Sequence, residues 1–82
     1  MSAQPIQPPM TGSWRVRVHA VRPFSIHGDL YFEVQVTRLD DPSEQMLAMR
    51  IPQHAAPTTP VSGQILELAF LMGQVTSARA AG

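Results

Sequence analysis

Residues 30–37, Leu-Tyr-Phe-Glu-Val-Gln-Val-Thr, decide the fold class of this 82-residue chain. Every second residue in the stretch is apolar, and most of its residues are aromatic or β-branched. That combination is typical of a β-strand with one face in a core and the other in solvent. The stretch therefore predicts a half-buried strand and favours a β-rich domain.

The flanking sequence extends this pattern on both sides. Apolar residues alternate with Arg15, Arg17 and His19 over residues 14–20, which predicts a first strand that ends at Pro23. Residues 23–29 are expected to form a turn or loop. After a polar turn at residues 40–44, residues 46–51 predict a third strand ended by Pro52, and residues 52–62, with three prolines, predict a surface loop.

Residues 63–81 allow two interpretations. Good helix formers and an apolar face support a helix that Ser62 would cap. A strand pair instead places Leu66, Leu68, Phe70 and Met72 on one side, and the chain reverses at Gly73. A helix would hold Gly73 and a Val-Thr-Ser run in its interior, where all are unfavourable, so two strands are favoured.

Length and composition predict one small domain. The apolar fraction of 44% is that of a folded protein, and 82 residues support a single core. Residues 1–13 contain three prolines and no charge, so they are expected to form a flexible Pro-rich arm before a domain at residues 14–82. No leader pattern or bilayer-length apolar run is present, so we expect a cytoplasmic protein that does not enter membranes.

Five short strands joined by Pro-rich connections predict an all-β fold, a small, partly open five-stranded barrel. The element order, and residues 61–68, Val-Ser-Gly-Gln-Ile-Leu-Glu-Leu, are similar to the Gly–Asp/Gln–hydrophobic approach to the fourth strand of OB-fold (oligonucleotide/oligosaccharide-binding) proteins. The chain resembles in particular the small bacterial single-strand-binding and primosomal OB proteins. This resemblance implies binding of single-stranded DNA or RNA by a homodimer.

Catalytic and metal chemistry find little support in the sequence. Ser25, His27 and Asp29 alternate, but alternate residues of an extended chain lie about 7 Å apart, too far for a triad. The chain has no Cys, and its three His lie on different elements without ligand spacing. We therefore expect no enzyme activity, no cofactor and no metal.

An arginine-rich face is the main functional indication. It predicts a nucleic-acid site on the first strand, the first loop and the facing strands, because Arg contacts phosphate and aromatic rings stack on bases. The alternative is a solvated face on which Glu33 pairs with an Arg. The candidate residues are Arg15, Arg17, His19, Arg22, Phe24, Tyr31 and Arg50.

The distribution of charge along the chain supports nucleic-acid binding more than the net charge does. The chain is formally neutral, but residues 1–39 hold four Arg and two acidic residues, a net charge of +2. Residues 40–82 hold two Arg and four acidic residues, a net charge of −2. A modest affinity for nucleic acid is therefore expected.

A second hypothesis is a protein-interaction subunit of a larger complex. It would dock through the N-terminal arm and an apolar fourth strand, with candidate interface residues Ile65, Leu66, Leu68, Phe70 and Met72. Trp14 and Phe32 share the apolar face of their strands and are predicted to lie in the core. Met46, Met49 and Met72 are predicted to fill it.

Overall fold

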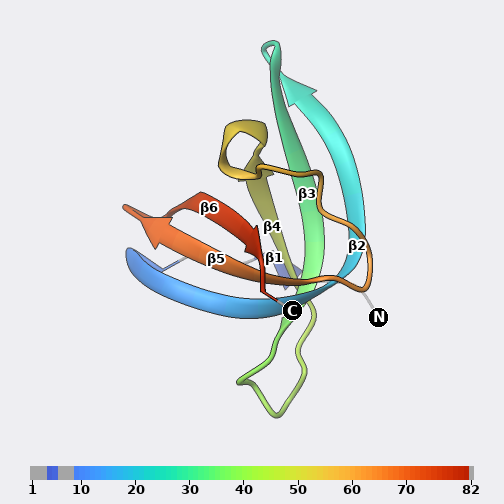
Figure 1. Ribbon diagram of the computed structural model, residues 1–82, viewed down its shortest axis with the longest axis vertical. Helices are drawn as coiled ribbons and strands as arrows, with labels where there is room; N and C mark the ends of the chain where they lie inside the picture. Colours follow the sequence, from blue (N-terminus) through green and yellow to red (C-terminus); the bar gives the residue numbers. More distant parts are fainter. Residues whose placement is uncertain (1–3, 6–8, 82) are drawn as a thin grey trace.

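The computed structural model describes residues 4, 5 and 9–81, which form one sheet and no α-helix (Figure 1). Five of the strands are antiparallel to their neighbours and curl into a partly open sheet that is compatible with a small OB-like barrel, so the predicted all-β class is confirmed. The elements are β1 (Gln4–Pro5), β2 (Thr11–Ile26), β3 (Asp29–Arg38), β4 (Leu47–Pro52), the 3-10 helix η1 (Gln53–Ala55), β5 (Ile65–Leu71) and β6 (Gln74–Ala80).

Strand β2 organises the sheet, whose order is β1-β4-β3-β2-β5-β6. Its first part pairs with β5 and its later part with β3, so one long strand joins the two sides of the barrel. Strands β4 and β6 approach each other without forming a ladder, while β1 pairs in parallel with the first residues of β4. The barrel is therefore open between β4 and β6.

A β-bulge at His19 divides β2. Val18 pairs with Val36 and Ala20 with Gln35, which leaves His19 without an opposite residue. The predicted alternation holds up to Val18, and beyond it Val21 packs against the core while Ala20 is exposed. Bulges bend a strand and increase its twist, so the later half of β2 takes a new direction.

Pro23 does not end the first strand, contrary to the prediction. Strand β2 continues to Ile26, and the chain reverses in a two-residue turn at His27 and Gly28, both with positive φ. Proline is compatible with this position because β2 is an edge strand there, with β3 as its only neighbour. The strand also begins at Thr11, before the predicted start at Trp14.

The helical interpretation of residues 63–81 is wrong. Strands β5 and β6 form a hairpin that reverses at Met72 and Gly73, again with positive φ at both residues. Glycine adopts this conformation without steric cost, whereas in the middle of a helix it costs about 1 kcal/mol relative to alanine.

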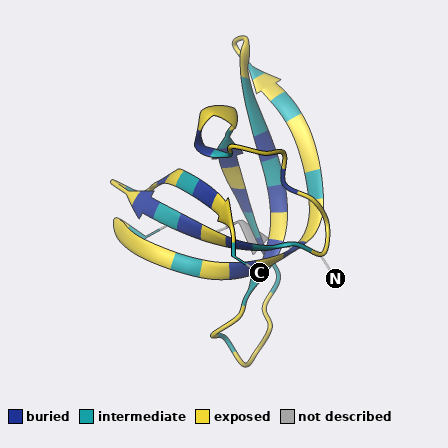
Figure 2. Ribbon diagram, in the orientation of Figure 1, coloured by how far each residue is buried: buried dark blue, intermediate teal, exposed yellow. Residues whose placement is uncertain are grey.

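The core lies between the inward faces of the curled sheet, and Figure 2 shows buried and exposed residues alternating along the strands. Phe32 and Met49 are buried as predicted, whereas Met46 is half-buried and Met72 is 75% exposed, so the core prediction for Met72 is wrong. Trp14 packs at the edge of the core, its ring edge-on to Phe70. The buried apolar residues are Val16, Val18, Phe32, Val34, Val36, Leu47, Met49, Ile51, Ala55, Leu66, Leu68, Phe70, Val75 and Ala78.

None of the helical structure in the described residues is long and apolar enough to cross a membrane.

Candidate functional site

Strands β2, β3 and β4 present an outer face built from rows of three side chains. The register aligns Arg22 with Glu33 and Glu33 with Arg50, and the next row joins Phe24, Tyr31 and Pro52. Residues directly opposite in adjacent antiparallel strands point to the same side of a sheet. We call these two rows, a charged row beside an apolar one, the outer face.

The charged row is only partly neutralised. Arg22 donates a hydrogen bond from its guanidinium to Oε1 of Glu33 at 3.2 Å. Within the described residues no carboxylate lies within ion-pair distance of Arg50, whose guanidinium instead sits 5.3 Å from the centre of the Phe24 ring. The row therefore has one positive charge in excess.

The apolar row contains a stacked aromatic pair. The rings of Phe24 and Tyr31 have centroids 5.6 Å apart and planes inclined by 24°. Both side chains are half-buried, so each ring also remains accessible to solvent. A cation over one ring and a second ring against it form a surface that can accept a flat, negatively charged ligand.

The predicted nucleic-acid residues fall into two groups. Arg22, Phe24, Tyr31 and Arg50 come together on the outer face, whereas Arg15, Arg17 and His19 lie further along β2. The carboxylate of Glu67 on β5 pairs with the Nε of Arg15 at 3.6 Å, and both side chains are well exposed.

His19 and Arg17 complete the second group. The ring of His19 is hydrogen-bonded through Nε2 to the hydroxyl of Thr37 at 2.9 Å, and Arg17 lies opposite Thr37 in the register. Neither residue borders an aromatic ring among the contacts of the described residues. This part of β2 lacks the combination of cation and ring found on the outer face.

Arg38 has a role that sequence reasoning missed. Its guanidinium lies 4.3 Å from the centre of the Trp14 ring and forms a bidentate contact with Asp40, at 3.0 and 2.8 Å. The proximity of Asp40 in the sequence was the available signal, but the approach of Trp14 depends on how β2 and β3 pair. Arg38 covers an edge of the core and lies apart from the outer face.

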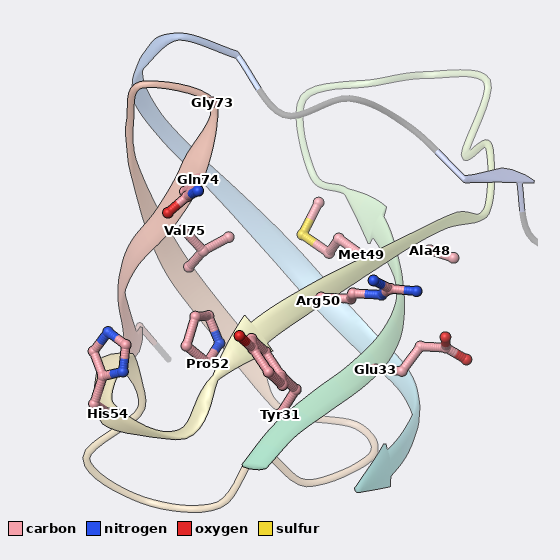
Figure 3. Close-up of a pocket in the computed structure, with 10 residues that line it drawn as sticks. All are labelled: Tyr31, Glu33, Ala48, Met49, Arg50, Pro52, His54, Gly73, Gln74 and Val75. Carbon is pink, nitrogen blue, oxygen red and sulfur yellow. The ribbon is translucent and has the colours of Figure 1, made fainter. Parts of the chain in front are cut away.

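A hollow of about 610 Å³ borders the outer face, in the opening between β4 and β6 (Figure 3). Tyr31, Arg50 and Pro52 line it from the sheet, and Gln74 lines it from β6. His54, on η1, stands at one end. Sequence reasoning gave Gln74 and His54 no role because only the tertiary approach of β4 and β6 brings them together.

The predicted interface residues do not form one surface. Leu66, Leu68 and Phe70 are buried in the core, and Ile65 is half-buried. Their side chains pack inside the barrel because every second residue of β5 points inward. Met72 alone of this set is strongly exposed, at the β5–β6 turn.

The remaining polar clusters show no catalytic or metal-binding geometry in the part of the chain described. No hydrogen bond joins the side chains of Ser25, His27 and Asp29 among these residues. Across residues 4, 5 and 9–81, no group of three His, Asp or Glu side chains is arranged to hold a metal ion.

No protein-family model matches the chain, and no curated protein or solved structure gives a significant match.

Proposed function

We propose that this protein is a non-enzymatic, OB-like module that binds single-stranded DNA or RNA on the outer face. The observation that carries the proposal is the stacked pair of Phe24 and Tyr31, with Arg50 over the Phe24 ring and Arg22 in the adjoining row. Single-strand binding requires positive charge for the phosphates and aromatic rings for unpaired bases, and both occur here within two rows.

The connectivity of the strands supports an OB-like assignment. The first long strand, β2, lies between the second and fourth strands of the barrel, and the fifth strand, β6, follows the fourth. OB folds bind oligonucleotides on the face of their second and third strands, which correspond here to β3 and β4. Those strands carry Tyr31, Glu33 and Arg50.

The charge of the outer face limits the expected affinity. Glu33 neutralises Arg22, so the face offers few phosphate contacts, and affinity depends on the number of phosphates engaged. A homodimer would double the number of phosphates engaged, so we also propose that the protein self-associates. Stacking then supplies the preference for unpaired strands.

The test is fluorescence anisotropy with a labelled, mixed-sequence single strand, repeated at increasing salt. We expect binding that weakens with salt and a loss of about tenfold or more at low salt in the Arg22→Ala/Arg50→Ala double variant. Arg79→Ala is the matched control, because Arg79 is exposed on β6 and lies opposite Glu67, away from the outer face. Absence of binding at low salt contradicts the proposal, as does an equal loss in the control.

A second candidate function, docking onto a protein partner, is favoured by the apolar β5–β6 turn. Leu71 and Met72 are exposed there, and Met10 lies beside them because its carbonyl accepts a hydrogen bond from the N–H of Gly73 at 3.3 Å. We expect a stoichiometric partner that a Leu71→Ser/Met72→Ser variant no longer retains. Normal nucleic-acid binding by that variant would separate the two functions.

A further inference from the structure

The opening between β4 and β6 exposes two strand edges to each other. Strand β4 pairs with β3 on one side, and β1 covers only Leu47 and Ala48 on the other. Strand β6 pairs with β5 alone. Edge strands carry backbone N–H and C=O groups that no strand satisfies, so both sides of the opening can donate and accept hydrogen bonds.

The hollow in this opening has an apolar base and a polar rim. The inward-facing residues Met49 and Val75 are buried and form part of its lining (Figure 3). The Tyr31 hydroxyl, the His54 ring and the Gln74 amide lie around it, and none is hydrogen-bonded to another described side chain or backbone group. A ligand there would meet an apolar surface and several polar side-chain groups that are bonded to no other residue in the part of the chain described.

We propose that the hollow between β4 and β6, which we call the gap, accepts one unstacked nucleobase of the bound nucleic acid. The Gln74 amide and the backbone edges of β4 and β6 hydrogen-bond the edge of the base. The inference rests on the proposed function and adds a base-binding position to it. A volume of about 610 Å³ lies in the range of small-molecule sites, and the ring of Pro52 offers a flat apolar surface. The gap is continuous with the outer face through Tyr31 and Arg50, which line both.

Charge favours a base over a phosphate in this position. Glu33 and Arg50 are the acidic and basic residues of the lining, and Glu33, which pairs with Arg22, places a carboxylate at the side where the gap meets the outer face. A phosphate there would lie near the Glu33 carboxylate, whereas a neutral base needs only hydrogen bonds and apolar contact. An amide such as Gln74 can donate and accept at once, as the edges of bases require.

The test uses the free nucleosides deoxyadenosine and deoxycytidine, which carry no phosphate, in an NMR titration of amide signals. We expect shifts at residues 73–75 and 49–54 that persist when the salt concentration is raised about tenfold, because no counterions are released. Gln74→Ala is expected to weaken nucleoside binding about fivefold, the effect of losing a hydrogen-bond partner. Gln35→Ala, the same truncation on the exposed side of β3 outside the gap, should leave it unchanged.

The outcomes separate this inference from the proposed function. If the mixed-sequence strand binds but neither nucleoside shifts the gap residues, or if shifts appear only around Phe24, the inference is overturned and the proposed function stands. If neither strand nor nucleoside binds, both are overturned. Equal losses in Gln74→Ala and Gln35→Ala also overturn the assignment of Gln74. Unchanged Trp14 fluorescence in both variants shows that each is folded.

Discussion

The two halves of β2 both carry exposed arginine but have different surroundings. Residues 11–18, the barrel half, pair with β5 and, from Val16 onward, with β3, whereas residues 20–26, the hairpin half, pair with β3 alone. The barrel half carries Arg15 and Arg17 alternating with apolar residues, and the hairpin half carries Arg22 alone. In the barrel half Arg15 meets Glu67, and in the hairpin half Arg22 lies next to the row of Phe24 and Tyr31. Neighbouring strands, more than the pattern itself, decide what an arginine-rich strand can do.

The largest expected difference is in stability. Val16→Ala in the barrel half should lower the free energy of unfolding by about 2 to 3 kcal/mol, because it leaves a cavity beside a fully buried position. Val21→Ala in the hairpin half should cost less than about 1 kcal/mol, since Val21 is half-buried and its surroundings can relax. Urea unfolding followed by fluorescence of Trp14, the only tryptophan, measures both. Equal losses would remove the distinction between the halves.

The next effect is on stacking. Tyr31→Ala should weaken binding of a single strand by about tenfold or more, because stacking of one base on an aromatic ring contributes about 1 to 3 kcal/mol. Tyr31→Phe keeps the ring and should retain most of the affinity. Anisotropy titrations at one salt concentration compare them. Similar losses in the two variants would mean that the ring is not the contact.

A smaller effect separates the arginines of the two halves. Arg15→Ala/Arg17→Ala should weaken strand binding about threefold at low salt, less than the Arg22→Ala/Arg50→Ala variant, because Arg15 already faces Glu67 and neither lies beside an aromatic pair. The slope of affinity against salt gives the number of phosphates lost in each. A larger loss of affinity in the Arg15→Ala/Arg17→Ala variant than in the Arg22→Ala/Arg50→Ala variant would place the bound nucleic acid along β2 instead of across the outer face.

Substitutions in the two hairpin turns are expected to change the stability by smaller amounts. His27 and Met72 occupy equivalent positions before glycine, both with positive φ, which Asn adopts more easily than a bulky apolar residue. Met72→Asn should stabilise the protein by about 0.5 to 1 kcal/mol, whereas His27→Asn should change it by a few tenths at most, since His tolerates this conformation. Thermal unfolding of the two variants tests this, and destabilisation by Met72→Asn would show that the exposed side chain is needed.

The smallest expected effect is on the titration of Asp41, in the loop between β3 and β4. The hydroxyl and then the N–H of Ser43, donating to Asp41 at 2.8 and 3.0 Å, lower the pKa of that carboxyl, with a lesser contribution from the charge of Arg38. When folding lowers the pKa of a carboxyl, its ionised form stabilises the folded protein at any pH above the pKa of the unfolded state. That stabilisation disappears as the pH falls through the pKa of the folded state. Ser43→Ala should return the pKa toward the ordinary aspartate value. An NMR titration of the Asp41 carboxyl measures it, and an unchanged midpoint contradicts it.

Much of the fold could be predicted because its strands carry local signals. The alternation in residues 30–37 was sufficient for β3, and Gly73 with the Val-Thr-Ser run after it favoured strands over a helix without excluding the helix. The bulge at His19 and the passage of β2 through Pro23 could not be predicted. Each depends on which strand lies alongside, and that information is not in the local sequence.

The candidate site was predictable in its residue types and only partly in its arrangement. Arg22, Phe24, Tyr31 and Arg50 were proposed together and come together in the structure. Arg15 and Arg17 were proposed with them, but both lie further along β2, where they pair with Glu67 and Ile65 of β5. The gap beside β6 required contacts between residues distant in sequence, so Gln74 and His54 could not be found.

The bulge at His19 has a consequence for changes in chain length. Without His19, Val18 and Ala20 would be consecutive, and Ala20, Arg22 and Phe24 would keep their present side of the sheet. Deleting this residue therefore straightens β2 and preserves the chemistry of the hairpin, whereas deleting one residue after the bulge turns Arg22 or Phe24 toward the core. His19 thus supplies curvature to β2. The tip of the hairpin can lengthen or shorten by two residues on each strand while every side chain keeps its side of the sheet.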